Sequence, residues 1–385
     1  MWRIVALLAA GIVVVIVGIS LVAGGSGEVR ASAIFSSVDT SISGYARAIA
    51  PHTWDFPQDF GPHPDFQTEW WYYTGNLADE NGRRFGFQFT IFRRAITPIV
   101  YESDSEWRTN QIYMAHFTVT DVTGDQFYHQ QRFSRGAAGL AGATTDPRYH
   151  VWLDDWQIQA QDDSARSVSI MAATDEVAID LQLEQIKPPA LQGDHGLSQK
   201  GDEPGNASYY YSLTRLLTEG TITIGDTVYT VSGTTWKDHE FSTSALGDTA
   251  QGWDWFGLQL DDDRELMLGQ IRLVDGGREP AFGGLLVYPD GSTRTLDSSD
   301  FTFTVTGRWQ SPHTGATYPA GWQIGINIGE TEPLNLTLTP LISDQELTDT
   351  GNVDYWEGAV RITGDATGYG YAELTGYVNA MTGRF

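Results

Sequence analysis

A two-residue alternation of apolar and polar side chains recurs along most of this sequence. Phe85, Phe87, Phe89 and Ile91 alternate with glycine, glutamine and threonine. Because successive side chains of a strand point to opposite faces, this spacing predicts a strand with one buried face. The same pattern is found at residues 177–183, 222–224, 301–305, 324–328 and 334–338.

Turn-forming pairs separate these alternating segments. Asn81-Gly82 and Asp290-Gly291 are two examples, and such pairs are typical of the tight turns between antiparallel strands. No long amphipathic helical pattern interrupts them. The sequence therefore predicts an all-β protein of many short strands, as in sandwiches and barrels.

The composition limits the function more than the fold. With 385 residues, 41% of them hydrophobic, the chain is able to bury one large core or two moderate ones. Its formal net charge of −26 argues against nucleic acid as a partner and against docking of the folded body on anionic lipid. The absence of cysteine excludes disulfides, thiolate metal sites and cysteine nucleophiles.

The amino-terminal region predicts export. An uncharged run, rich in Val, Ile, Leu and Ala, extends from Ile4 to Ala23 and is long enough to cross a bilayer as a helix. We therefore expect residues 1–24 to be a transmembrane anchor, with a cleaved signal segment ending near Ala31-Ser32-Ala33 as the alternative. Residues 25–51 are predicted to be a linker. The folded body is expected outside the cytoplasm, anchored to the membrane or secreted.

A repeated pattern indicates two domains. An aromatic strand, a short turn and a second strand ending in arginine occur at residues 71–93 and again at residues 255–272. Repetition of one structural unit is the usual sign of tandem domains. We expect one β domain at residues 52–235 and a second at residues 236–385.

The stretch from 234 to 260 contains the most chemically suggestive residues. On strands, His239 shares a face with Phe241, and Asp254 shares a face with Phe256. If the phenylalanines mark the buried side, an imidazole and a carboxyl enter an apolar interior, one from each strand. Together in one cavity they are able to perform acid–base chemistry. The same spacing fits a structural hydrogen-bonded pair that ties two strands together.

Seven motifs stand out along the folded body: EWWYYTGNL (69–77), GFQFTIFRR (86–94), KPPALQGDHGLSQKG (187–201), NASYYYSLTR (206–215), TTWKDHEF (234–241), GWDWFGLQL (252–260) and YGYAELTGY (369–377). They resemble motifs of the carotenoid 1,2-hydratase family and its exported AttH-like relatives. The resemblance implies two tandem lipocalin-like barrels behind the amino-terminal helix, with a cavity at or near their junction. It also implies a greasy, unsaturated ligand, namely an isoprenoid, polyene or lipid.

The implied reaction is the addition of water to a terminal double bond. The hydratases carry a motif similar to H-x-W followed later by Y-x-D. This chain keeps the His and Asp as His239 and Asp254, but it has Phe241 and Gly252 in place of the Trp and Tyr. Two hypotheses follow, a hydratase-like hydro-lyase and a non-catalytic lipid carrier or chaperone at the cell envelope.

For the enzyme hypothesis we assign roles to two residues. Asp254 is the predicted proton donor, since its aromatic neighbours in the sequence favour burial and burial raises the pKa of a carboxyl. His239 is expected to orient it or to activate the attacking water. The alternative is that Asp254 pairs with a nearby backbone group.

Other side chains are predicted to contact the ligand. Trp71 and Tyr73 share a strand face, although the sequence favours Trp71 as a tryptophan that closes the base of a barrel over one that stacks on the ligand. Tyr210 follows a long connection bearing His195, which we expect to be a lid or an inter-domain loop. The complete predicted set is Trp71, Tyr73, His195, Tyr210, Phe241, Trp253, Trp255 and Phe256.

No metal site or cofactor is predicted. Asp238, His239 and Glu240 are ligand types, but adjacent strand residues point to opposite faces and do not converge on one ion. His63, which stands between two prolines, is expected at the cavity entrance. The predicted partners are an apolar small molecule and, through the amino-terminal segment, a membrane. The sequence does not indicate a protein partner.

Overall fold

The computed structural model describes residues 42–100, 102–243, 246–247, 249–348 and 353–381. The predicted anchor at residues 1–24, and most of the linker at residues 25–51, lie outside this part of the chain. No helix within it is long and apolar enough to cross a membrane. It contains twenty-five strands and one short 3-10 helix, η1 (Gln58–Phe60), so the all-β prediction is confirmed.

The first sheet has thirteen antiparallel strands in the order β4-β3-β2-β1-β13-β12-β9-β8-β7-β6-β5, with β10 and β11 pairing to β12. Two long strands, β12 and β13, lie at its centre. The strands are β1 (Thr68–Asp79), β2 (Arg84–Ala95), β3 (Gln111–Asp121), β4 (Gln126–Arg135), β5 (Ala141–Thr144), β6 (His150–Leu153), β7 (Trp156–Ala160), β8 (Ser167–Ala173), β9 (Val177–Gln185), β10 (Ala190–Leu191), β11 (Leu197–Gln199), β12 (Ala207–Ile224) and β13 (Thr227–Ser242).

The second sheet has ten strands in the order β17-β16-β15-β14-β25-β24-β22-β21-β18, with β23 pairing to β24. A separate hairpin is formed by β19 and β20. Their bounds are β14 (Ala250–Leu260), β15 (Glu265–Leu273), β16 (Gly284–Val287), β17 (Thr293–Leu296), β18 (Phe301–Val305), β19 (Arg308–Gln310), β20 (Thr317–Pro319), β21 (Trp322–Ile326), β22 (Leu334–Pro340), β23 (Glu346–Leu347), β24 (Tyr355–Gly364) and β25 (Gly368–Leu374).

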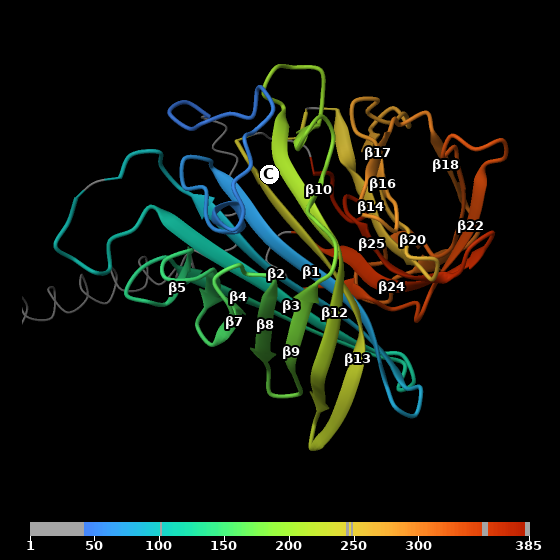
Figure 1. The fold of residues 1–385 in the computed structure, drawn as a ribbon, viewed down its shortest axis with the longest axis horizontal. Coiled ribbons are helices and arrows are strands. Elements are labelled where there is room, and N and C mark those ends of the chain that lie inside the picture. The colour runs from blue at the N-terminus through green and yellow to red at the C-terminus, as the bar shows by residue number, and fades with distance from the viewer. Residues whose placement is uncertain (1–41, 101, 244–245, 248, 349–352, 382–385) are drawn as a thin grey trace, which may run out of the picture.

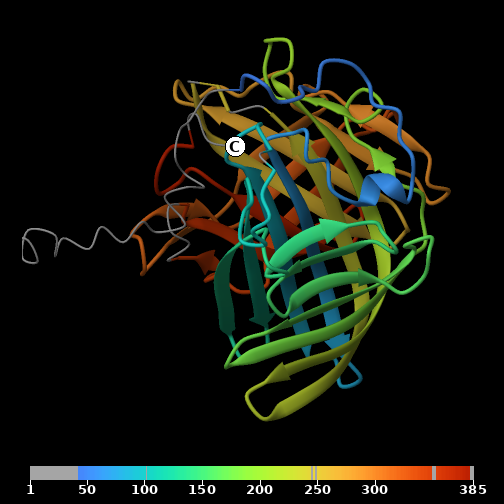
Figure 2. The same ribbon diagram turned by 90° about the vertical axis from the view of Figure 1, so that its left-hand side faces the viewer.

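Each sheet curls into a nearly closed barrel around its own apolar interior, and the two barrels lie side by side (Figures 1 and 2). Trp71, Phe89 and Trp156 are in the first interior, whereas Phe256 and Trp322 are in the second. This agrees with the predicted tandem lipocalin-like barrels. The alternation of apolar and polar residues along the strands produces these apolar interiors, because every second side chain points into the barrel.

A third apolar cluster fills the junction between the barrels. Trp236, Tyr210 and Tyr72 come from the first sheet, and Trp255 and Met267 come from the second. Strands β13 and β14 are therefore buried on both faces, one facing a barrel interior and the other facing the junction. Double burial explains why β14 has aromatic side chains on the successive residues Trp255 and Phe256.

The predicted domain division after residue 235 falls inside β13, which pairs with β1 and β12 along its length. The chain leaves the first sheet after Ser242 and enters the second at Ala250. The repeated pattern marked the aromatic strands correctly, but it carried no information about which sheet β13 completes.

Candidate functional site

His239 faces the interior of the first barrel from β13. Its ring stacks on Trp71 at 5.1 Å between centroids. Its Nε2 lies 2.9 Å from Oε1 of Glu69, and its Nδ1 lies 3.0 Å from the Tyr211 hydroxyl. Burial, the largest influence, lowers the pKa of His239 to about 4, although Glu69 acts to raise it.

Asp254 faces the interior of the second barrel, from β14 between β15 and β25. Gln270 Nε2 donates to it at 2.7 Å, Arg272 Nε at 3.0 Å and the Tyr377 hydroxyl at 3.0 Å. Burial raises the pKa of Asp254, whereas these three donors act to lower it. All three groups donate hydrogen bonds to Asp254, and Arg272 is a cation. We therefore assign Asp254 as an ionised carboxylate that is paired with Arg272.

The prediction that His239 and Asp254 share one cavity is wrong. They lie on strands of different sheets and face different interiors, so they are also not the hydrogen-bonded pair of the alternative hypothesis. Alternation with a period of two identifies the two faces of a strand, but it does not show into which barrel interior each face points. The catalytic roles of the two residues stay predictions.

Around His239, the first barrel holds a charge-compensated cluster. Glu69 is fully buried, with Arg93 Nε 2.8 Å from Oε2 and His63 Nδ1 2.8 Å from Oε1. Although burial acts to raise the pKa of Glu69, Arg93 and the two histidines lower it well below its usual range. Asp59 and Glu69 in turn raise the pKa of His63 to about 9 against the effect of burial. This cluster fastens the irregular lead-in segment to β1, β2 and β13.

Lys237 occupies the same face of β13 and was missed as a site residue. It is 2% exposed, its Nζ lies 4.6 Å from the Phe60 ring and 4.8 Å from the Tyr149 ring, and it donates to the Tyr211 hydroxyl at 3.2 Å. Burial lowers the pKa of Lys237 to about 7. Its place between buried positions of one strand face was the signal that sequence reasoning could have used.

The opposite face of β13 carries Asp238 into the junction. The Tyr210 hydroxyl donates to Asp238 at 2.6 Å, the Ser212 hydroxyl at 2.5 Å and Trp236 Nε1 at 2.7 Å. Among the described residues, no cation is a hydrogen-bond partner of Asp238. Burial therefore dominates and raises the pKa of Asp238 to about 7, despite the three donors. This carboxyl is able to give and take a proton near neutral pH.

Two more carboxyls lie in the junction. Glu357 and Glu373 are directly opposite each other on β24 and β25. Burial, and then the charge of Glu373, raise the pKa of Glu357, whereas the Tyr72 and Tyr355 hydroxyls act to lower it. Burial also raises the pKa of Glu373. Like charges this close do not ionise together readily, so the junction holds protonated carboxyls at neutral pH.

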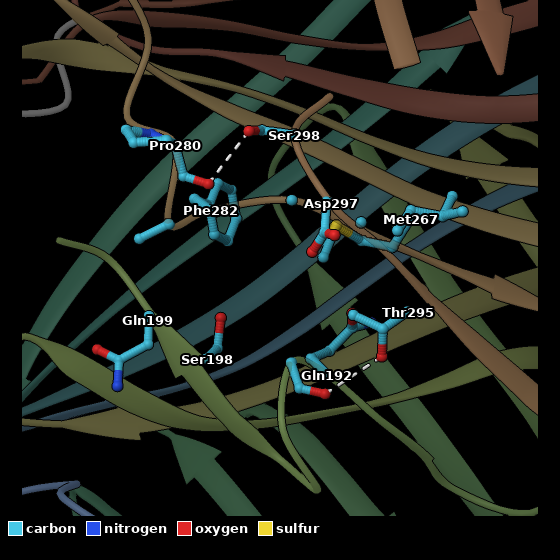
Figure 3. A pocket seen from close by; sticks show the side chains of 14 residues that line it. Gln192, Ser198, Gln199, Met267, Pro280, Phe282, Thr295, Asp297 and Ser298 are labelled. Atoms are coloured by element: carbon cyan, nitrogen blue, oxygen red, sulfur yellow. Dashed lines mark hydrogen bonds between the residues drawn. The ribbon is translucent and has the colours of Figure 1, made fainter. Parts of the chain in front are cut away.

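A hollow opens beside this junction, between the connection that follows β10 and strands β15 to β17 (Figure 3). Its volume of about 60 Å³ admits a few water molecules. Met267 and Phe282, in its wall, belong to the same apolar cluster as Trp255. The lining residues are Gln192, Gly193, Ser198, Gln199, Met267, Pro280, Ala281, Phe282, Gly283, Gly284, Thr295, Leu296, Asp297 and Ser298.

Hydrogen bonds connect the hollow to Asp238. Gln192, in the wall, donates from Nε2 to the Ser212 hydroxyl at 2.8 Å, and Ser212 donates to Asp238. The other amide atom, Gln192 Oε1, is buried and has no hydrogen-bond partner in the part of the chain that the structure describes. The arrangement offers water a polar contact two hydrogen bonds away from a proton-exchanging carboxyl.

The predicted ligand-contacting residues divide among several regions. Tyr210, Trp253 and Trp255 are at the junction, as expected for a site there. His195 has a side chain that is 81% exposed, and its carbonyl accepts a hydrogen bond from Trp54.

The remaining four lie elsewhere. Trp71 donates to the Phe60 carbonyl at 2.9 Å, which fits the alternative of a tryptophan closing the barrel, and Tyr73 lies in the same interior. Phe241 stacks on His63 at 3.6 Å, and Phe256 is part of the second core. We therefore take the candidate site to be the junction, with Asp238 at its centre.

A family model described as AttH-like matches residues 47–377. The chain belongs to the AttH-like family. A solved structure described as an AttH protein from Nitrosomonas europaea is 34% identical, with a TM-score of 0.76 over 86% of this chain and 100% of that chain. This confirms the AttH-like branch of the resemblance.

More distant structures share the fold of this AttH-like protein. Kievitone hydratase from Nectria haematococca is 15% identical, with a TM-score of 0.63 over 89% of this chain and 97% of that chain. CghA is 12% identical, with a TM-score of 0.52 over 86% and 96% of the two chains. No curated protein matches the chain.

Proposed function

We propose that this AttH-like protein binds a small apolar, unsaturated molecule at the junction of its barrels and adds water to one of its double bonds. The ligand class is an isoprenoid, polyene or lipid, and an acyclic carotenoid is the specific substrate to test first. The hollow of about 60 Å³ is too small for such a ligand, so binding would require the apolar side chains of the junction to move apart. The observation that carries the proposal is the hydrogen-bonded path from the hollow through Gln192 and Ser212 to Asp238. It brings water and an acid to one aromatic site.

The proposed reaction begins with protonation of the alkene. An isolated double bond is a poor base, so the donor must be a carboxyl that retains its proton at neutral pH. Asp238 meets this condition, because burial raises its pKa to about 7. The resulting carbocation would lie against the aromatic walls formed by Trp236 and Trp255, and a desolvated aromatic face stabilises a cation by about 2 kcal/mol.

Water from the hollow then completes the reaction. Its oxygen bonds to the cationic carbon, and the proton it releases returns to the Asp238 carboxylate through Ser212 or Tyr210. The sum is one water added to one double bond, with the acid regenerated. The raised pKa values of Glu357 and Glu373 support the proposal, because raised pKa values keep these two groups neutral. Neutral neighbours do not raise the pKa of Asp238 further, so Asp238 is able to release its proton.

A fold shared with kievitone hydratase supports a hydratase less strongly than the junction chemistry does, because one fold hosts many reactions. The rival function is a lipid carrier. It is favoured by the three hydrogen bonds that Asp238 receives, which also suit a purely structural carboxylate. For both functions we propose that residues 1–24 anchor or export the chain, with the folded body outside the cytoplasm.

One experiment separates the two functions. The full chain in detergent is incubated with an acyclic carotenoid and, separately, with a lipid extract, and products are examined by mass spectrometry for the gain of one water. Asp238→Asn tests the proposed donor, and Asp254→Asn tests the residue predicted from sequence. Water addition lost in Asp238→Asn and kept in Asp254→Asn supports the proposal. Binding without conversion by the wild type supports the carrier, and loss in Asp254→Asn alone returns the acid to Asp254.

A further inference from the structure

A second cluster, outside the junction, lies where the lead-in segment crosses the first barrel. Asp59, on η1, places Oδ1 3.0 Å from Nε2 of His63 and 3.2 Å from Nε2 of His52. Asp59 is 8% exposed, whereas the His52 side chain is 28% exposed. Two imidazole nitrogens and one carboxylate oxygen thus converge from a single irregular segment.

We propose that His52, Asp59 and His63 bind a divalent transition-metal ion of the zinc type. Metal–ligand bonds of about 2.0–2.1 Å place the ligands of a tetrahedral ion roughly 3.3–3.4 Å apart. The two nitrogen–oxygen separations, 3.0 and 3.2 Å, are within a few tenths of an ångström of that spacing. The three ligand atoms all lie within 4.8 Å of one another. Two of the three pairs of ligand atoms are therefore already close to the spacing that the ion requires.

The surroundings of the ligands are those of a metal site. His63 directs its other nitrogen, Nδ1, to the Glu69 carboxylate at 2.8 Å, and this bond orients the ring so that Nε2 is able to ligate once an incoming ion has displaced its proton. The second oxygen of Asp59 accepts the backbone N–H of Asp55 at 2.5 Å, which leaves Oδ1 for the ion. Carboxylate support behind a histidine ligand is a regular feature of zinc sites.

Aromatic side chains hold both imidazoles. Phe241 stacks on His63 at 3.6 Å with an interplanar angle of 6°, and Trp54 meets His52 edge-on at 4.8 Å. Tyr209 lies 5.0 Å from the His52 ring. The rings are thereby oriented in advance, and one ligand remains near solvent as an entry path.

The deeper set of His63, Glu69 and His239 is a weaker candidate. Its three ligand atoms also lie within 4.8 Å of one another. Arg93, however, donates to the same Glu69 carboxylate at 2.8 Å, so a cation there would lie beside a fixed positive charge. His239 and Glu69 are also fully buried, so bulk solvent does not reach them to supply a fourth ligand. The outer set has three protein ligands and an open position, the arrangement of zinc sites that bind a water or a substrate.

Metal titration of the full chain tests this proposal. The protein is treated with chelator, dialysed, and titrated with Zn²⁺ by calorimetry and with Co²⁺ by visible absorption. We expect one equivalent of each ion to bind, with Co²⁺ giving the d–d bands of a four- or five-coordinate site. His52→Ala is expected to weaken Zn²⁺ binding at least 100-fold, because removal of one ligand leaves two. His195→Ala is the matched control, since that side chain is 81% exposed.

The outcomes are decisive in both directions. Wild-type binding that is lost in His52→Ala and kept in His195→Ala supports the site, and Asp59→Asn should reproduce the loss. Circular dichroism of each variant shows that the fold is kept. Absence of stoichiometric binding by the wild type, or equal binding by His52→Ala, overturns the proposal. So does a loss of equal size in His195→Ala.

Discussion

Buried carboxyl groups have opposite pKa shifts at the end of the first barrel and at the junction between the barrels. Glu69 and Asp238 are both buried, yet the pKa of Glu69 is lowered and the pKa of Asp238 is raised. Glu69 has Arg93 and two histidines as partners, whereas Asp238 has two hydroxyls and an indole. Burial is common to both, so the charge of the partner decides the protonation state. The cluster at the end of the first barrel therefore stabilises an ionised carboxylate, whereas the junction stabilises a protonated carboxyl.

Asp238→Asn should give the largest change if the junction is catalytic. Loss of a positioned general acid is expected to lower water addition by about 10²–10⁴-fold, while the folded state keeps a side chain of the same shape. Initial rates of product formation measure this effect. A variant at the same rate as the wild type would remove the proton donor from the junction.

Arg93→Met should cause the largest loss of stability in the first barrel. The change leaves the Glu69 carboxylate buried beside two histidines without its main cation, and breaking a buried ion pair costs about 3–5 kcal/mol. Urea unfolding measures the change in free energy. Asp238→Asn is the comparison, because no cation is lost there and a smaller effect is expected. Equal destabilisation by the two variants would contradict the contrast between the regions.

The pH dependence of stability should differ between wild type and Glu373→Gln. The pKa of Glu373 is raised on folding, so its contribution is fully present below its ordinary pKa and is lost as the pH rises toward the raised value. Glutamine mimics the protonated form at every pH. We expect similar urea midpoints at pH 5 and a higher midpoint for the variant at pH 9. A lower midpoint for the variant at pH 9 would show that the charged form is the stabilising one.

Lys237→Met should have the smallest effect at alkaline pH. Burial lowers the pKa of the amine from its ordinary value of 10.5 to about 7, so its contribution to stability is fully present above the ordinary pKa and is lost as the pH falls toward 7. Methionine fills a similar volume, and such exchanges usually cost less than about 1.5 kcal/mol. Thermal unfolding at pH 10 should be nearly unchanged, and at pH 5.5 the variant should melt at a higher temperature. Destabilisation at both values would indicate that the aromatic cage needs the cation.

Much of the architecture was predictable from local chemistry. The alternation from Phe85 to Ile91 required a strand with a buried face, and β2 has it. The aromatic motifs around Trp71 and Trp255 identified the family and the doubled barrel. Tyr210 and Trp255, which the sequence predicts to contact the ligand, lie at the junction. These features depend on neighbouring residues and on turns, which a sequence displays directly.

The site depended on contacts between distant segments. Alternation places His239 and Asp238 on opposite faces of β13, and the sequence favours the face that carries Phe241 as the one with chemistry. The face that carries His239 points into the core of the first barrel. The face that carries Asp238 packs against the second barrel and is therefore buried as well. No local pattern shows that the reverse side of a strand will be covered.

The sequence by itself determined the strands, their faces and the family, because side-chain period and turn residues act over a few positions. The tertiary structure decided which carboxyl groups are buried away from water and which of them are paired with a cation. Asp238 is enclosed by β14 and β25, and His52, Asp59 and His63 converge only because the lead-in segment folds back across the barrel. Protonation and metal affinity depend on distances in space, and the packing of two barrels sets those distances.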